Sequence, residues 1–142
     1  MENNVRIVIE SRQRAGVGDE ELIRVEAFGT CRTVNGRRHV LYEETREENG
    51  DRTKNHLILE EERAEVRRRG STDSLLIYDP AETQEGYIGN AFGTIPLLIV
   101  TDSYLMEERR EETRIRIKYR LKTGEETVLM CDMTMTIENK RQ

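Results

Sequence analysis

The chain has no tryptophan and only two cysteines, two histidines and two prolines in 142 residues. Two cysteines, Cys31 and Cys131, are too few for a disulfide framework, which favours a reducing compartment and free thiols. The longest apolar run has six residues, far fewer than a membrane-spanning helix requires. The first residues lack a basic segment followed by an apolar one, so no signal peptide is expected. The sequence therefore predicts a cytoplasmic protein with no membrane partner.

Charged residues make up 36% of the chain, and the apolar set makes up 35%. The net charge is −5, although arginine outnumbers lysine 19 to 4. Because the planar guanidinium of arginine pairs well with carboxylates, this composition predicts Arg–Glu ladders on a charged surface. The negative total charge argues against general affinity for nucleic acid.

Apolar and polar residues alternate in short segments along most of the chain, which is typical of strands with one buried face. Turn signals separate the segments, and the strongest are Asn35-Gly36, Asn49-Gly50 and Thr123-Gly124. Glu107–Glu112 is predicted to be a charged turn. The predicted strands are Val5–Glu10, Leu22–Val34, Arg37–Glu47, Thr53–Glu60, Ala64–Gly70, Leu75–Tyr78, Ile95–Val100, Arg114–Leu121 and Leu129–Ile137. We expect nine or ten strands in all, and only Leu59–Arg69 has a composition that also suits a helix.

One stretch, residues 86–101, combines three glycines with the longest apolar run. Because glycine tolerates backbone angles that other residues avoid, Gly86, Gly89 and Gly93 predict a bend or bulge. The run Ile95–Val100 predicts a strand whose two faces are both largely covered.

Short turns between consecutive strands make those strands antiparallel neighbours. A charged sheet of this many strands exposes unpaired edges unless it closes on itself. The sequence therefore predicts a single all-β domain over residues 1–142, an antiparallel up-and-down barrel of about eight to ten strands. A β-sandwich is the alternative architecture.

Five short motifs occur in an order and spacing that resemble those of a known family. They are Ser11-Arg12, Leu41-Tyr42-Glu43-Glu44, Arg68-Arg69-Gly70, Tyr87 followed by Phe92-Gly93-Thr94, and Tyr119-Arg120-Leu121. Together they resemble the YwiB-like family of small bacterial proteins of unknown function, from about Val5 to Glu138. The resemblance implies a lipocalin-like (calycin) barrel and supplies no substrate. Tyr87-Ile88-Gly89 departs from the family, which tends to have Tyr-x-Thr and one residue fewer before its aromatic-Gly pair.

The chain offers few groups for catalysis, metal binding or nucleotide binding. His39 and His56 lie on separate predicted strands, and neither belongs to a nucleophile motif. Two cysteines and two histidines in this distribution are too few for a metal site. The spacing of Gly86, Gly89 and Gly93 fits neither nucleotide-binding fingerprint. We therefore expect no enzyme activity, no cofactor and no metal.

A basic stripe, made of Arg114, Arg116, Lys118 and Arg120, follows one face of a predicted strand. A small barrel can bind single-stranded nucleic acid where aromatic residues interleave with such a stripe. Here the same-face neighbours are not aromatic, and Glu107–Glu112 supplies carboxylates at one end. We expect a solvated outer face and no nucleic-acid partner.

Some charged residues share a strand face with apolar ones. Arg68 shares its face with Val66, and Glu44 shares its face with Tyr42. Because a buried arginine must be paired and hydrogen-bonded, we predict an Arg68–Glu44 pair capped by Tyr42 or Tyr119. Two interpretations remain open: the cluster lies at the barrel mouth or fixes strand register, or it forms the polar end of a ligand cavity.

The candidate ligand-binding residues are Tyr42, Glu44, Arg68, Tyr87 and Tyr119. The sequence predicts a non-catalytic barrel that binds a small molecule with a polar or anionic head and an apolar body. The alternative is a structural or protein-interaction barrel with a filled interior and no small ligand.

Overall fold

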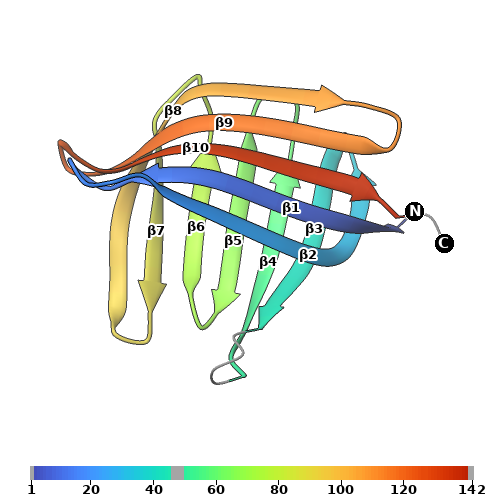
Figure 1. The fold of residues 1–142 in the computed structure, drawn as a ribbon, viewed down its shortest axis with the longest axis horizontal. Coiled ribbons are helices and arrows are strands. Elements are labelled where there is room, and N and C mark those ends of the chain that lie inside the picture. The colour runs from blue at the N-terminus through green and yellow to red at the C-terminus, as the bar shows by residue number, and fades with distance from the viewer. Residues whose placement is uncertain (1, 46–49, 141–142) are drawn as a thin grey trace.

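The structure is a computed structural model that describes residues 2–45 and 50–140 (Figure 1). In this part of the chain, ten strands form the fold. They are β1 (Glu2–Arg14), β2 (Glu21–Val34), β3 (Arg37–Thr45), β4 (Arg52–Leu59), β5 (Ala64–Gly70), β6 (Asp73–Tyr78), β7 (Gln84–Asn90), β8 (Gly93–Glu108), β9 (Glu112–Thr123) and β10 (Glu126–Asn139). In the described residues, no helix has the length and hydrophobicity needed to cross a membrane.

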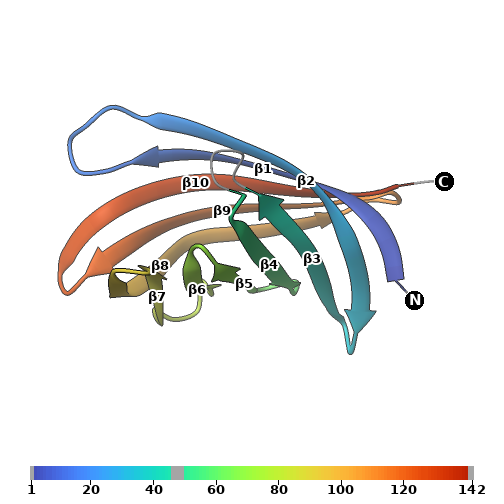
Figure 2. The same cartoon turned by 90° about the horizontal axis from the view of Figure 1, so that it is seen from below.

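Each strand pairs antiparallel with the strands before and after it, and β1 also pairs with β10. The sheet therefore closes into a ten-stranded barrel, which confirms the predicted up-and-down barrel over a sandwich. In Figure 1, β1, β2, β9 and β10 run roughly horizontally, and β4 to β7 run roughly vertically behind them. Figure 2 shows β1 and β2 on the upper side of the molecule and β4 to β7 on the lower side.

The alternation of residue types along each strand decides which side chains face the interior. In β9, Ile115 and Ile117 are fully buried, whereas Arg114 and Arg116, which alternate with them, face solvent. The predicted Asn35-Gly36 turn joins β2 to β3, and both of its residues have positive φ, at 52° and 76°. Fully buried aliphatic side chains from several strands fill the middle of the barrel. They include Val5, Ile7, Val40, Leu57, Leu59, Ile99, Ile115, Ile117 and Met135.

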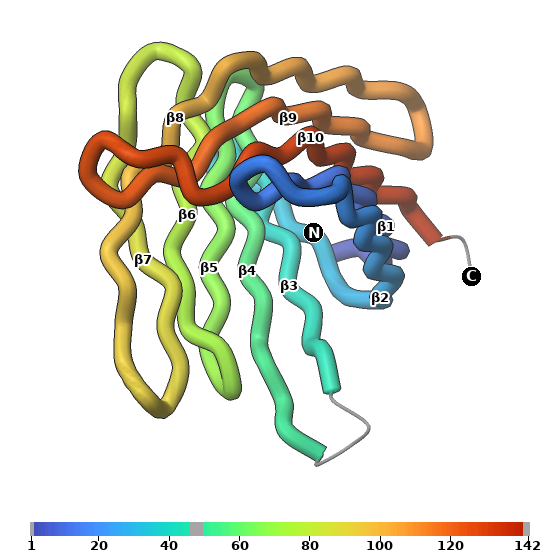
Figure 3. The backbone as a smooth tube through the Cα atoms, turned by 60° about the vertical axis from the view of Figure 1, so that its left-hand side comes forward, coloured from blue at the N-terminus to red at the C-terminus, as the bar shows by residue number. Residues whose placement is uncertain are grey.

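The barrel has two ends that differ in what they carry. The hairpin end carries the turns that follow β1, β3, β5, β7 and β9. The terminal end carries the other four turns, together with the start of β1 and the end of β10. The β1–β2 and β9–β10 turns of the hairpin end come forward in Figure 3.

The glycine-rich segment predicted to bend forms a strand instead. Gly86 and Gly89 lie within β7, and the chain reverses between Asn90 and Gly93. A Cβ atom at Gly86 would collide with the carbonyl oxygen of Leu75 on β6. Glycine is present at position 86 because a neighbouring backbone approaches closely, so the predicted bend was wrong at Gly86 and Gly89. At Gly93, which has a φ of 148°, the chain does reverse.

The predicted strand Ile95–Val100 was too short, and its coverage was overestimated. β8 continues to Glu108 and includes part of the predicted charged turn Glu107–Glu112. Ile95 is 57% exposed because β8 pairs with β9 only from Leu98 onward. The end of the predicted strand Arg37–Glu47, and Asn49 of the predicted Asn49-Gly50 turn, lie outside the described residues.

Candidate functional site

The predicted Arg68–Glu44 pair is present on the inner face, close to the hairpin end. Arg68 donates from Nη2 to Glu44 Oε2 at 3.2 Å and from Nε to Asn55 Oδ1 at 3.1 Å. The side chains of Arg68 and Glu44 are 35% and 32% exposed. The pair therefore lies where the interior meets solvent, in agreement with the interpretation that placed it at the barrel mouth.

Asn55 completes this cluster, and we did not predict it. Its side chain is 2% exposed, and its Nδ2 donates to the backbone oxygen of Thr53 at 3.3 Å. A signal was present in the sequence, because Asn55 shares its strand face with Leu57 and Leu59. Asn55, rather than a tyrosine hydroxyl, is the second hydrogen-bond partner of Arg68.

Arg68 belongs to a row of inward side chains that crosses five neighbouring strands, here called the inner row. Cross-strand register places its members directly opposite one another, in the order Asn55, Arg68, Ser74, Ile88 and Ile95. Ser74 Oγ is buried and has no hydrogen-bond partner among the described residues, which is uncommon for a buried hydroxyl. Along the inner row the side chains change from amide and guanidinium groups to isoleucines. Ile95 is its most exposed member.

Tyr42 and Tyr119 are more buried than the Arg68–Glu44 pair. Tyr42 is buried opposite Asn55, and burial, with a smaller contribution from the Glu44 carboxylate, raises its pKa. Tyr119 on β9 packs against Tyr78 on β6, with ring centroids 4.6 Å apart. Because β6 and β9 are not neighbours in the sheet, this contact crosses the interior. Burial raises the pKa of both rings of this pair.

Tyr87 lies apart from the other predicted site residues. It is 39% exposed on the outer face of β7, opposite Leu75 on β6 and Pro96 on β8. The structure thus brings Tyr42, Glu44 and Arg68 together on the inner face and separates Tyr87 from them.

Side chains cross the interior at the terminal end. Arg38 on β3 donates to Thr113 Oγ1 on β9 and pairs with Glu108 on β8, with 2.6 Å between Nη2 and Oε1. Tyr104 on β8 donates to the backbone oxygen of Glu60 at 2.5 Å. Because β3 and β4 lie far from β8 and β9 around the barrel, these contacts close the terminal end.

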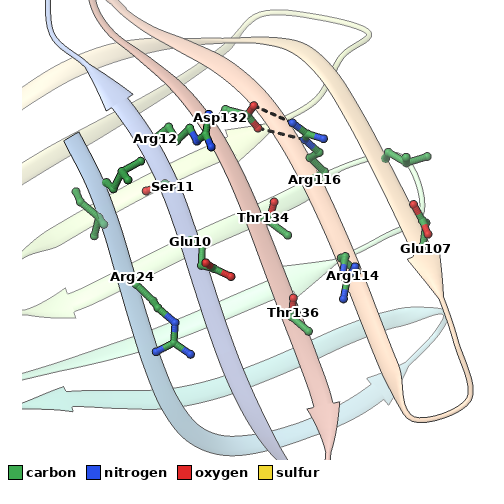
Figure 4. A pocket seen from close by; sticks show the side chains of 13 residues that line it. Glu10, Ser11, Arg12, Arg24, Glu107, Arg114, Arg116, Asp132, Thr134 and Thr136 are labelled. Atoms are coloured by element: carbon green, nitrogen blue, oxygen red, sulfur yellow. Dashed lines mark hydrogen bonds and ion pairs between the residues drawn. The ribbon is translucent and has the colours of Figure 1, made fainter. Parts of the chain in front are cut away.

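The outer face of β1, β2, β8, β9 and β10 holds a groove of about 770 Å³ in which opposite charges alternate. Arg116 donates to both carboxylate oxygens of Asp132, at 3.3 and 3.0 Å (Figure 4). The predicted basic stripe lies on this face, where Arg114 pairs with Glu112 and Arg120 pairs with Asp102. The charges of this groove are largely satisfied within the protein.

The outer face of β3 to β7 holds a second groove of about 700 Å³, here called the basic groove. Its lining has more basic than acidic residues and is bordered by apolar side chains. The lining residues are Leu41, Lys54, Asn55, His56, Arg67, Arg68, Arg69, Asp73, Ser74, Leu75 and Tyr87. Asn55, Arg68 and Ser74 are inner-row residues, so their side chains point away from this face.

The two histidines contact each other, with 2.9 Å between His39 Nδ1 and His56 Nε2. Burial, together with the nearby His39 and Arg67, lowers the pKa of His56. Cys31 is half-buried and Cys131 is buried, and both are free thiols. Among the described residues, no group of three or more His, Cys, Asp or Glu side chains could hold a metal ion.

The family model described as "Domain of unknown function (DUF1934)" matches residues 7–135. The chain belongs to this family. Its fold is similar to the crystal structure of ywiB protein from Bacillus subtilis, with a TM-score of 0.84 and 21% sequence identity. The similarity covers 99% of this chain and 94% of that chain. The predicted membership of the YwiB-like family and its barrel is thus confirmed. A search of the curated proteins found no match.

Proposed function

We propose that this DUF1934 protein is a non-catalytic barrel that binds a small molecule at its hairpin end. The inner row supports this proposal, because charged Arg68 and apolar Ile88 and Ile95 lie in one row on the inner face of the sheet, with Arg68 and Ile95 partly exposed. Small-molecule sites combine a few oriented polar groups with apolar walls, and the inner row supplies both. The proposed ligand has an anionic head at Arg68 and an apolar body along the isoleucines.

An anionic head suits the hydrogen-bonding groups near Arg68. The guanidinium presents a planar fork of donors that matches a carboxylate or phosphate. Ser74, next to Arg68 in the inner row, has a buried hydroxyl with no partner among the described residues. Glu44 is the present anionic partner of Arg68, so a ligand anion competes with Glu44 for the same guanidinium.

The contacts of Arg68 at the hairpin end support access of a ligand to this site. Arg68 contacts Asn55 on the adjacent strand β4 and Glu44 on β3, and these contacts do not cross the interior. Non-catalytic binding is favoured because the two histidines contact each other instead of a nucleophile. In a structural or interaction barrel, by contrast, the Arg68–Glu44 pair only fixes strand register.

Fluorescence titration with 11-(dansylamino)undecanoic acid tests the proposal, because this probe has a carboxylate head and a long apolar body. We expect saturable binding to the wild-type protein. Arg68→Met should weaken binding by about tenfold or more, because it removes a charge-assisted hydrogen bond. Glu44→Gln should strengthen binding, because it removes the competing carboxylate.

Arg116→Gln is the matched control, since Arg116 is also ion-paired but lies on the outer face. It should leave probe binding unchanged. Equal affinities of the wild-type protein and Arg68→Met would contradict the proposed site, and the absence of saturable binding would favour the structural barrel.

A further inference from the structure

The basic groove contains two pairs of basic side chains that stand directly opposite each other. Lys54 on β4 is opposite Arg69 on β5, and His56 is opposite Arg67. Like charges in directly opposite positions destabilise a sheet. Arg67 has a partner in Glu65, at 2.5 Å, but the ion pairs among the described residues include neither Lys54 nor Arg69. Two cations thus remain side by side in a concave surface.

Nearby carboxylates do not remove this excess. Asp73, the acidic residue of the lining, accepts a hydrogen bond at Oδ1 from the backbone N–H of Gly70, at 3.0 Å. Glu43 stands opposite Lys54 on β3, and no ion pair joins them in the described part of the chain. On the opposite outer face, by contrast, the solvent-exposed Arg116 makes a bidentate contact with Asp132. Unlike Arg116, the neighbouring cations Lys54 and Arg69 thus have no ion pair among the described residues.

Beside these cations, the lining of the groove becomes apolar. Leu75 is opposite Arg67, and Tyr87 is opposite Leu75, so the three lie in one row across β5, β6 and β7. Neighbouring strands are about 4.8 Å apart, and residues two apart along a strand are about 7 Å apart, so Tyr87 lies about 12 Å diagonally from Arg69. That distance matches a phosphate or diphosphate group joined through a sugar to one flat ring system.

We infer that the basic groove is a second binding site, for a small aromatic phosphate. The phosphate lies between Lys54 and Arg69, and the ring lies on Leu75 and Tyr87. A groove of about 700 Å³ has the size of a small-molecule site. The arginine fork and the lysine ammonium are the side chains that proteins use for phosphate. This inference does not rest on the proposed function, because the inner row faces the other side of the sheet.

The histidine pair fits this assignment. His56 borders Arg67 across the strands and is held by His39, and its pKa is lowered by burial, by His39 and by Arg67. An anion in the groove adds a negative charge beside these groups and relieves their repulsion. Binding of a phosphate should therefore raise the thermal stability of the protein.

Isothermal titration calorimetry with ADP, adenosine and pyrophosphate tests this site, since the last two compounds are the separate halves of the first. We expect ADP to bind more tightly than either half. Arg69→Gln and Lys54→Gln should each lower ADP affinity by about tenfold or more. Because each substitution also removes a like-charge contact, neither variant should be less stable than the wild-type protein.

Tyr87→Ala separates the two parts of the site. It should weaken ADP and leave pyrophosphate unchanged, whereas Arg116→Gln on the opposite outer face should change neither. Equal ADP affinity in Arg69→Gln and the wild-type protein would overturn the inference, as would no ADP binding to the wild-type protein. Displacement of ADP by short polyglutamate at equal concentration would also overturn it, in favour of an acidic peptide.

Discussion

The two ends of the barrel each contain an inward arginine, but the partners of the two arginines lie in different places. At the terminal end, Arg38 reaches across the interior to Thr113, and Tyr104 reaches across to the turn after β4. At the hairpin end, Arg68 contacts Asn55 on β4, the strand beside its own, and Glu44 on β3, the next strand along. An inward arginine thus closes one end of the barrel when its partner lies across the interior. It leaves the end open when its partners lie on nearby strands on the same side.

The largest expected effect compares the stability contributed by one isoleucine in the core with that of one isoleucine at the hairpin end. Ile115 is fully buried, so Ile115→Ala should lower the free energy of unfolding by about 2–5 kcal/mol. Ile95→Ala removes the same atoms from a side chain that is 57% exposed at the hairpin end. Its loss should be within about 1 kcal/mol. Urea denaturation measures both values, and equal losses would show that the hairpin end is packed like the core.

The next comparison separates the two members of the hairpin-end ion pair. Arg68→Met leaves Oδ1 of buried Asn55 without its partner, so we expect a loss of about 1–3 kcal/mol. Glu44→Gln should lower stability by no more than about 1 kcal/mol, because the pair is partly exposed. A loss of about 3–5 kcal/mol for Glu44→Gln would indicate a fully buried pair and a closed hairpin end.

Alkaline pH acts on tyrosines at both ends. Burial raises the pKa of Tyr42, Tyr78, Tyr104 and Tyr119. An unfolded tyrosine ionises near pH 10, so above that pH the folded chain holds protons that the unfolded chain has lost. Stability should be intact below about pH 10 and should then fall by about 1.4 kcal/mol per pH unit for each tyrosine that stays protonated. Urea denaturation on either side of pH 10, with tyrosinate absorbance, measures this fall, and constant stability would contradict it.

The smallest expected effect concerns the terminal end. Tyr104→Phe removes the hydrogen bond to the Glu60 carbonyl and should lower stability by about 0.5–1.5 kcal/mol. Amide hydrogen exchange should then rise at β8 and in the turn after β4 more than at the hairpin end. Uniform exchange across both ends would show that this contact does not hold the terminal end closed.

Much of the barrel could be predicted because the residue pattern along single strands fixes which side chains point inward. The same pattern in β3 and β5 predicts that Glu44 and Arg68 both face the interior, where the structure pairs them. Asn55 between them followed the same pattern and was overlooked.

Contacts across the barrel could not be predicted in this way. Tyr104 faces inward because the β8–β9 register shifts between Thr101 and Ser103, which reverses the alternation beyond that point. The partner of Arg38 depends on the register between strands that are not neighbours. The basic groove could not be predicted either, because Tyr87 in its lining belongs to β7, and the glycines of β7 indicated a bend instead of a strand. A register shift decides the position of Tyr104, and the closure of the barrel brings Arg38 to its partner.

Methyl NMR with isoleucine labelling tests the central claim most directly, because isoleucines lie at both depths of the barrel. On addition of 11-(dansylamino)undecanoic acid, the methyl signals of Ile88 and Ile95 should shift, and those of Ile115 and Ile117 should stay in place. Shifts confined to the deep isoleucines, or to Ile58 on the outer face of β4, would contradict a ligand site at the hairpin end.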